Sequence, residues 1–86
     1  MEMTLGSARK KFIQDYSKIL TEAQINEAVN WFGQLHNDGY DDPNFNDGIA
    51  ARAAIALVKL EAGMELTKPE ATATEHPIVK RYLPKE

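Results

Sequence analysis

The chain has 86 residues, no cysteine, and 13 acidic against 10 basic side chains, which gives a formal charge of −3. This length allows one small domain and excludes enzyme folds that need ~200 residues or more, such as a (β/α)₈ barrel. The lack of cysteine excludes thiol catalysis and cysteine-based zinc sites. No apolar run approaches the ~20 residues of a membrane helix, and the first fifteen residues have no apolar stretch typical of a secretory signal. We therefore expect a cytoplasmic protein that is not bound to a membrane.

The first predicted helix spans residues 5–19. Apolar residues recur there at three- and four-residue steps, as one face of a helix requires. That stripe consists of Leu5, Ala8, Phe12, Tyr16 and Ile19, widened by Ile13 and Leu20. Thr4 or Ser7 is suited to cap the start of this helix.

The second predicted helix spans residues 22–38 and is the most strongly marked in the sequence. Thr21 and Gln24 have the spacing of a capping box, in which two side chains satisfy the first free amides of a helix. The apolar face consists of Ile25, Ala28, Val29, Phe32, Leu35 and His36. We expect Gly39 to close the helix in the left-handed conformation that glycine tolerates. The following segment, residues 38–48, is rich in turn-forming residues and is predicted to be a loop, with Asn46 or Asp47 capping the next helix.

The third predicted helix, residues 49–62, is apolar over most of its circumference, and six of its fourteen residues are alanine. Such a helix must be covered on more than one side. We expect it to be the central helix of a three-helix domain, or to meet a second copy of the chain through its second face. The residues predicted for that self-association, as a homodimer, are Ala51, Ile55, Val58 and Ala62.

The C-terminal part of the chain changes character twice. Residues 67–75 are small and polar and are predicted to form an extended linker. Residues 76–86 return to apolar spacing and predict a short helix that docks on the chain's own core or on a partner. The predicted fold is therefore all-α: a compact three-helix domain over residues 1–66, a polar linker and a short C-terminal helix.

Negative charge is concentrated in the middle of the chain. Residues 21–50 carry six acidic side chains and no lysine or arginine, whereas the segments on either side have a small positive excess. Aromatic residues lie in or near this acidic stretch, and large rings supply much of the binding energy of protein interfaces. The predicted partner-binding residues are Trp31, Asp38, Tyr40, Asp41, Asp42 and Phe45. For Trp31 and Phe45, a role in closing the end of the core is the stronger alternative.

Metal binding, catalysis and nucleic-acid binding are poorly supported. The loop matches the calcium-binding EF-hand at Asp42, Asn44 and Asn46, but Asp47 and Ala53 occupy the positions that require glycine and glutamate. No phosphate-binding loop or nucleophile motif is present, and neither His36 nor His76 is placed beside a nucleophile by the sequence. The acidic composition disfavours nucleic acid. We therefore expect no enzyme activity, no cofactor, no bound metal and no nucleic-acid partner.

The leading hypothesis is a non-enzymatic protein-interaction module, a small adaptor or inhibitor that occludes a larger protein with a basic surface. Accessory proteins of phages and mobile elements are one class of this size. Reversing the charge of Asp38, Asp41 and Asp42 should slow association and leave stability nearly unchanged. The alternative is a small-ligand or nucleotide binder with a pocket between helices or subunits. Its predicted binding residues are Arg9, Lys10, Tyr16, Lys80, Arg81 and Tyr82.

Overall fold

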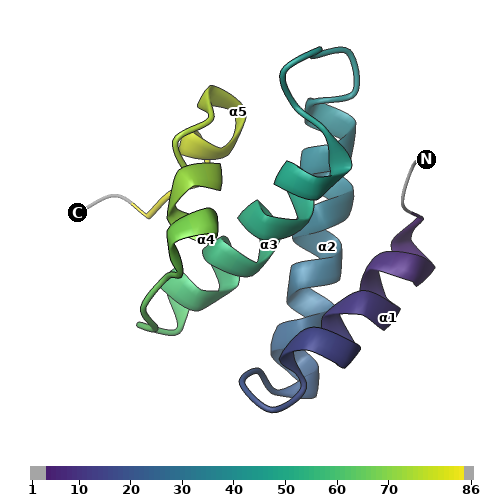
Figure 1. Ribbon diagram of the computed structural model, residues 1–86, viewed down its shortest axis with the longest axis vertical. Helices are drawn as coiled ribbons and strands as arrows, with labels where there is room; N and C mark the ends of the chain where they lie inside the picture. The colour runs from purple at the N-terminus through teal and green to yellow at the C-terminus, as the bar shows by residue number, and fades with distance from the viewer. Residues whose placement is uncertain (1–3, 85–86) are drawn as a thin grey trace.

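The computed structural model describes residues 4–84 and folds them into five helices without a strand (Figure 1). The three longer helices are α1 (Leu5–Tyr16), α2 (Glu22–Asp38) and α3 (Asp47–Glu61). Two short helices, α4 (Lys68–Ala73) and α5 (Pro77–Lys80), follow. The prediction of an all-α domain is confirmed.

Side-chain caps fix where the helices begin. Thr21 opens α2 with the predicted capping box: its hydroxyl accepts from the Gln24 amide at 3.1 Å, and the Gln24 side chain accepts from the Thr21 amide at 2.8 Å. Thr4 forms the same reciprocal arrangement with Ser7 at the start of α1. At α3, the Asn46 side chain accepts from the Ile49 amide at 2.9 Å, so that Asn46 is the cap and the helix starts two residues earlier than predicted.

Helix α1 is shorter than predicted. It ends at Tyr16, whose carbonyl accepts hydrogen bonds from the amides of both Ile19 and Leu20. This tight turn directs Leu20 into the core and leaves Ile19 53% exposed. The predicted apolar stripe is consequently narrower in the structure, because Leu5 and Ile13 are also exposed and Ala8 and Phe12 are its fully buried members.

Gly39 ends α2 as predicted, but for a different reason. Its φ angle is −101°, outside the left-handed region, so the predicted conformation is wrong. Glycine is needed there because a Cβ atom would lie 2.1 Å from Cδ2 of Phe45. The ring of Phe45 packs directly on the backbone at the end of α2. Gly63, which follows α3, does have a left-handed φ of +72°.

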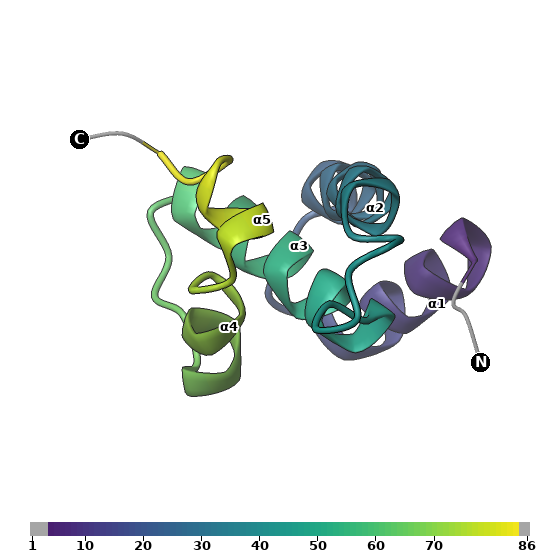
Figure 2. The same cartoon turned by 90° about the horizontal axis from the view of Figure 1, so that it is seen from above.

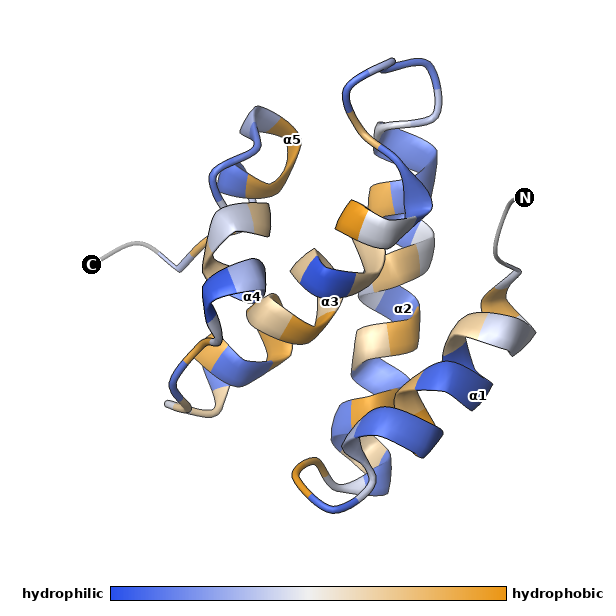
Figure 3. Cartoon of the chain, in the orientation of Figure 1, coloured by the Kyte–Doolittle hydropathy of each residue, from blue (hydrophilic) through white to orange (hydrophobic). Residues whose placement is uncertain are grey.

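Helix α3 is the central helix of the fold. Viewed from above, α2 and α5 lie on one side of it and α4 and the end of α1 on the other (Figure 2). Alanines occupy both sides, and Ala50, Ala53, Ala54 and Ala56 have no exposed surface. Their small side chains allow neighbouring helices to approach closely, and the largely apolar colouring of α3 in Figure 3 reflects this position.

Residues 67–75 do not form the predicted extended linker, since residues 68–73 form α4, which packs against α3. Thr67 and Glu70 make a third capping box, and Pro69 lies in the first turn, where its missing amide costs nothing. Ala73 is 6% exposed against the core. The segment has few large apolar residues, which explains why its composition resembles that of a linker.

The short helix α5 docks on the chain's own core. Val79 is fully buried and Ile78 is 8% exposed. His76 caps the helix, because its Nδ1 accepts from the Ile78 amide at 3.2 Å. Tyr82, just beyond the helix, packs against Trp31 of α2 with ring centroids 5.1 Å apart.

Candidate interaction surface

The acidic loop between α2 and α3 is held by its own hydrogen bonds. The Asp42 amide donates to the Gly39 carbonyl at 3.0 Å, and the Asp42 side chain accepts from the Asn44 amide at 2.8 Å. Phe45 is only 8% exposed and turns inward, where its ring lies 4.7 Å from that of His76. The loop is therefore attached to the core at its second half, and its first half faces solvent.

Two contacts between a histidine and an aspartate join the loop to the helices. His36 of α2 lies 2.7 Å from a carboxylate oxygen of Asp47, the first residue of α3. His76, the cap of α5, lies 3.7 Å from a carboxylate oxygen of Asp42. These contacts fix both ends of the loop relative to α2, α3 and α5.

Tyr40 and Asp41 are the solvent-facing part of this loop. Tyr40 is 66% exposed, the most exposed large apolar side chain among the described residues, and its ring stands edge-on to His36 with centroids 5.8 Å apart. Asp41 is exposed and its side chain forms no hydrogen bond or ion pair within residues 4–84. We call Tyr40, Asp41 and Asp42 the acidic loop surface.

Among the described residues, no lysine or arginine balances the negative charge on this surface. Within residues 4–84, neither Asp41 nor Asp42 forms an ion pair with a lysine or arginine. The loop is predominantly hydrophilic (Figure 3). An exposed aromatic ring beside carboxylates that have no lysine or arginine partner within residues 4–84 suits contact with a positively charged protein surface.

Trp31 and Asp38 belong to a second cluster, on the outer side of α2. The Tyr82 hydroxyl donates a hydrogen bond to the Asp38 carboxylate, and the Gln34 amide donates to the same carboxylate at 3.0 Å. The hydrogen bond to Asp38 raises the pKa of Tyr82, and burial adds to the rise. Trp31 is half-buried under Tyr82. The predicted partner-binding residues therefore divide, because Trp31, Asp38 and Phe45 hold the fold together while the acidic loop surface faces outward.

The charge reversal predicted to leave stability nearly unchanged is therefore restricted to one of the three aspartates. Asp38 accepts two side-chain hydrogen bonds, and Asp42 holds both the Asn44 amide and His76. Reversing either charge would disturb the fold. Asp41 is the position where the charge can be changed without loss of a side-chain contact within residues 4–84, because its carboxylate forms no hydrogen bond or ion pair there.

The residues predicted for the alternative ligand site do not come together. Arg9 of α1 donates to Asn26 of α2, and Tyr16 donates to Glu70 of α4 at 3.3 Å. Helices α1 and α5 lie on opposite sides of the molecule in both views (Figures 1 and 2). Lys10 is consequently remote from Lys80, Arg81 and Tyr82, and the set forms no pocket.

The predicted self-association face is mostly covered by the chain itself. Ala51, Ile55 and Val58 are 6%, 1% and 1% exposed, and Ala62 is the exposed member. Ala51 and Ile55 lie beside Phe12 and Tyr16 of α1, and α4 also packs against α3. The second apolar face of α3 is therefore largely buried within the chain, and self-association through it stays a prediction.

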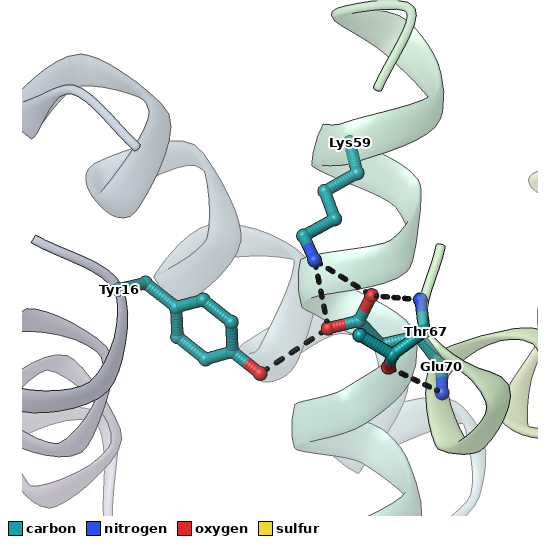
Figure 4. A network of polar contacts seen from close by, with 4 residues as sticks. All are labelled: Tyr16, Lys59, Thr67 and Glu70. Carbon is teal, nitrogen blue, oxygen red and sulfur yellow. Dashed lines mark hydrogen bonds and ion pairs between the residues drawn. The ribbon is translucent and has the colours of Figure 1, made fainter. Parts of the chain in front are cut away.

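A buried network of charged and polar side chains, which the sequence patterns did not predict, joins Tyr16, Lys59, Thr67 and Glu70 (Figure 4). Lys59 and Glu70 are 5% and 2% exposed, and the Lys59 ammonium donates to both carboxylate oxygens at 2.8 and 3.1 Å. The Thr67 amide donates to Glu70 at 2.9 Å and the Tyr16 hydroxyl at 3.3 Å. The T-x-x-E pattern at residues 67–70 carries the same capping-box signal as the T-x-x-Q pattern at residues 21–24.

Electrostatics in this network favour the ion pair. Burial acts to raise the pKa of Glu70, but hydrogen bonds from Lys59 and from the Thr67 amide, with the charge of Lys59, outweigh it and hold the pKa below its ordinary value. Burial, followed by the Glu70 charge, raises the pKa of Tyr16. Lys59, the Thr67 amide and the Tyr16 hydroxyl all donate to the Glu70 carboxylate. The network therefore holds α1, α3 and α4 together.

Comparisons with protein-family models, curated proteins and solved structures found no match to the chain. Among the described residues, no helix combines the length and apolar character needed to cross a membrane. In residues 4–84, no group of three or more histidine, aspartate or glutamate side chains is arranged to hold a metal ion.

Proposed function

We propose that the chain is a non-enzymatic protein-interaction module, a small adaptor or inhibitor whose acidic loop surface binds a basic surface on a larger protein. The observation that carries the proposal is the exposed ring of Tyr40 beside Asp41, a carboxylate with no internal partner in residues 4–84. Acidic charge without compensation raises the rate of encounter with a basic protein.

Each residue of the surface has a distinct part in this proposal. Asp41 and Asp42 supply the long-range attraction. Tyr40 supplies a large rigid area that a partner can bury, at little cost in side-chain entropy. Its edge-on contact with His36 supports the ring from below.

The fold supports presentation of the loop as a rigid unit. Phe45 packs on the end of α2, and the pairs His36–Asp47 and His76–Asp42 tie the loop to three helices. A surface that is already ordered loses little conformational entropy on binding. A small inhibitor or adaptor benefits from such preorganisation.

Affinity capture from the source cell, with quantitative mass spectrometry, tests the proposal. Wild-type bait is compared with Asp41→Lys and with Tyr40→Ala at equal bait loading. Proteins with basic surfaces should be enriched by wild type, and both variants should lose them. The enrichment should also fall as salt rises, because screening shortens the range of the attraction.

The matched control is Glu65→Lys, which makes the same charge change at an exposed position in the loop between α3 and α4, at the other end of α3. This variant should retain the captured proteins. Equal capture by wild type, Asp41→Lys and Tyr40→Ala would overturn the assignment of the acidic loop surface.

A further inference from the structure

A groove of about 520 Å³ lies between α3 and α4, apart from the acidic loop surface. Helix α3 contributes Ile49 and Arg52, and α4 contributes Lys68, Pro69, Thr72 and Ala73. The two helices diverge toward the start of α3, with α4 running upward beside it in Figure 1. The volume is within the range of ~300–1,000 Å³ that is typical of small-molecule sites.

The groove combines apolar walls with two cations, Arg52 and Lys68. Ile49, Pro69 and Ala73 supply apolar surface. Neither the Arg52 guanidinium nor the Lys68 ammonium forms a side-chain hydrogen bond or ion pair within residues 4–84, whereas Lys59 on the same helix as Arg52 is fully paired. The positive charge at the groove is therefore available to a ligand.

The remaining lining residues differ in charge between the two ends of α4. Glu75 and His76 follow the C-terminal end of α4, and Lys68 is its first residue. His76 uses Nδ1 to cap α5, and its Nε2 is directed at Asp42. Both ring nitrogens of His76 thus face other groups of the chain, so His76 contributes surface to the groove. The carboxylate of Glu75 disfavours a negatively charged ligand group at the C-terminal end of α4.

We propose that this groove binds a small organic acid: a molecule with an apolar body and one carboxylate, held by Arg52 and Lys68. The guanidinium can bind the carboxylate through two parallel hydrogen bonds. The apolar body then contacts Ile49, Pro69 and Ala73. This site uses none of the residues of the acidic loop surface, although His76 in its wall lies 3.7 Å from the carboxylate of Asp42.

Titration of the ¹⁵N-labelled chain with 4-phenylbutyrate, followed by two-dimensional NMR, tests the proposal. The amide signals of Ile49, Thr72 and Ala73 should shift and saturate with a Kd on the order of 1 mM, as expected for a ligand of this size. The neutral amide 4-phenylbutyramide has nearly the same shape. It should bind roughly ten-fold more weakly, because it lacks the charge that Arg52 and Lys68 recognise.

Charge-neutralising variants separate a built site from general attraction to cations. Arg52→Gln and Lys68→Gln, both at exposed positions, should each weaken binding of 4-phenylbutyrate about ten-fold. Lys80→Gln is the matched control, because Lys80 is also exposed and lies outside the groove. It should leave the Kd unchanged.

Three results would overturn the proposal. They are no shift at these amides up to 10-fold above the expected Kd, equal affinity for the acid and its amide, and equal weakening by Lys80→Gln. Circular dichroism of each variant shows whether the helices are retained. Should Arg52→Gln lose them, Lys68→Gln decides the outcome alone.

Discussion

The Lys59–Glu70 pair offers a direct test of how α4 is held to the core. We predict that Lys59→Met and Glu70→Gln each destabilise the chain by about 3 kcal/mol or more, because each leaves a buried polar or charged group without its partner. Domains of this size are stable by roughly 0.05–0.15 kcal/mol per residue, or ~4–13 kcal/mol in total. A single substitution should therefore remove a large share of the stability.

The double variant distinguishes a specific pair from general damage. An amide at position 70 keeps an oxygen for the Thr67 amide and gains a donor for the Tyr16 hydroxyl, so the variant that also carries Lys59→Met leaves no buried charge. Its loss of stability should be smaller than the sum of the two single losses by about 2 kcal/mol or more. Urea unfolding at pH 7, followed by circular dichroism at 222 nm, measures all four proteins of this cycle.

Additivity would refute this reasoning. If the double loss equals the sum of the single losses within ~0.5 kcal/mol, Lys59 and Glu70 do not interact in the folded chain. Lys11→Met is a suitable control for the loss of a cation, since Lys11 pairs with Asp15 at 3.4 Å on the exposed side of α1. That variant should change stability by less than ~0.5 kcal/mol.

Three further predictions concern pH and the end of α2. The pKa of Glu70 is lowered in the folded chain, so its contribution to stability is complete above the ordinary value of 4.5 and is lost as the pH falls through the folded pKa. The urea midpoints of wild type and Glu70→Gln should therefore converge as the pH falls through that pKa. The pKa of Tyr16 is raised in the folded chain, so its contribution to stability is lost as the pH rises, and wild type should lose stability relative to Tyr16→Phe above pH 10. A constant difference between the two proteins would contradict the burial of the hydroxyl. Gly39→Ala should lower the free energy of unfolding by about 1–3 kcal/mol, measured by thermal or urea unfolding, because the added methyl group meets the Phe45 ring. The control is Gly6→Ala, whose added methyl group has no contact closer than 3.9 Å and should not destabilise the chain. Equal effects of the two substitutions would count against the packing described for Phe45.

The three longer helices could be predicted because local signals agree with the tertiary structure. The capping box at Thr21, the apolar spacing from Ile25 to Leu35 and the alanine-rich segment all act over a few residues. Helix α4 was not predicted, because its stability depends on Glu70, whose partner Lys59 lies eleven residues earlier on another helix. Hydrophobic periodicity carries no information about such a pair.

The division of the acidic segment was equally beyond sequence patterns. Asp38 and Asp41 are similar in the sequence, and their roles differ only because Tyr82 reaches Asp38 from the far end of the chain. Likewise, Ala51 and Ile55 are covered within the chain, beside Phe12 and Tyr16 of α1, and the apolar pattern of the third predicted helix does not reveal this cover. The groove beside Arg52 exists only because α4 is a helix.

Binding kinetics with a captured basic protein test the central claim most directly, that Tyr40 and Asp41 form the interaction surface. Immobilised wild type, Asp41→Lys, Tyr40→Ala and Glu65→Lys are compared by surface plasmon resonance at low and physiological salt. We predict that Asp41→Lys mainly lowers the association rate and its salt dependence, while Tyr40→Ala raises the dissociation rate and weakens affinity by about 2 kcal/mol. Rates for these two variants that match those of wild type and Glu65→Lys would contradict the claim.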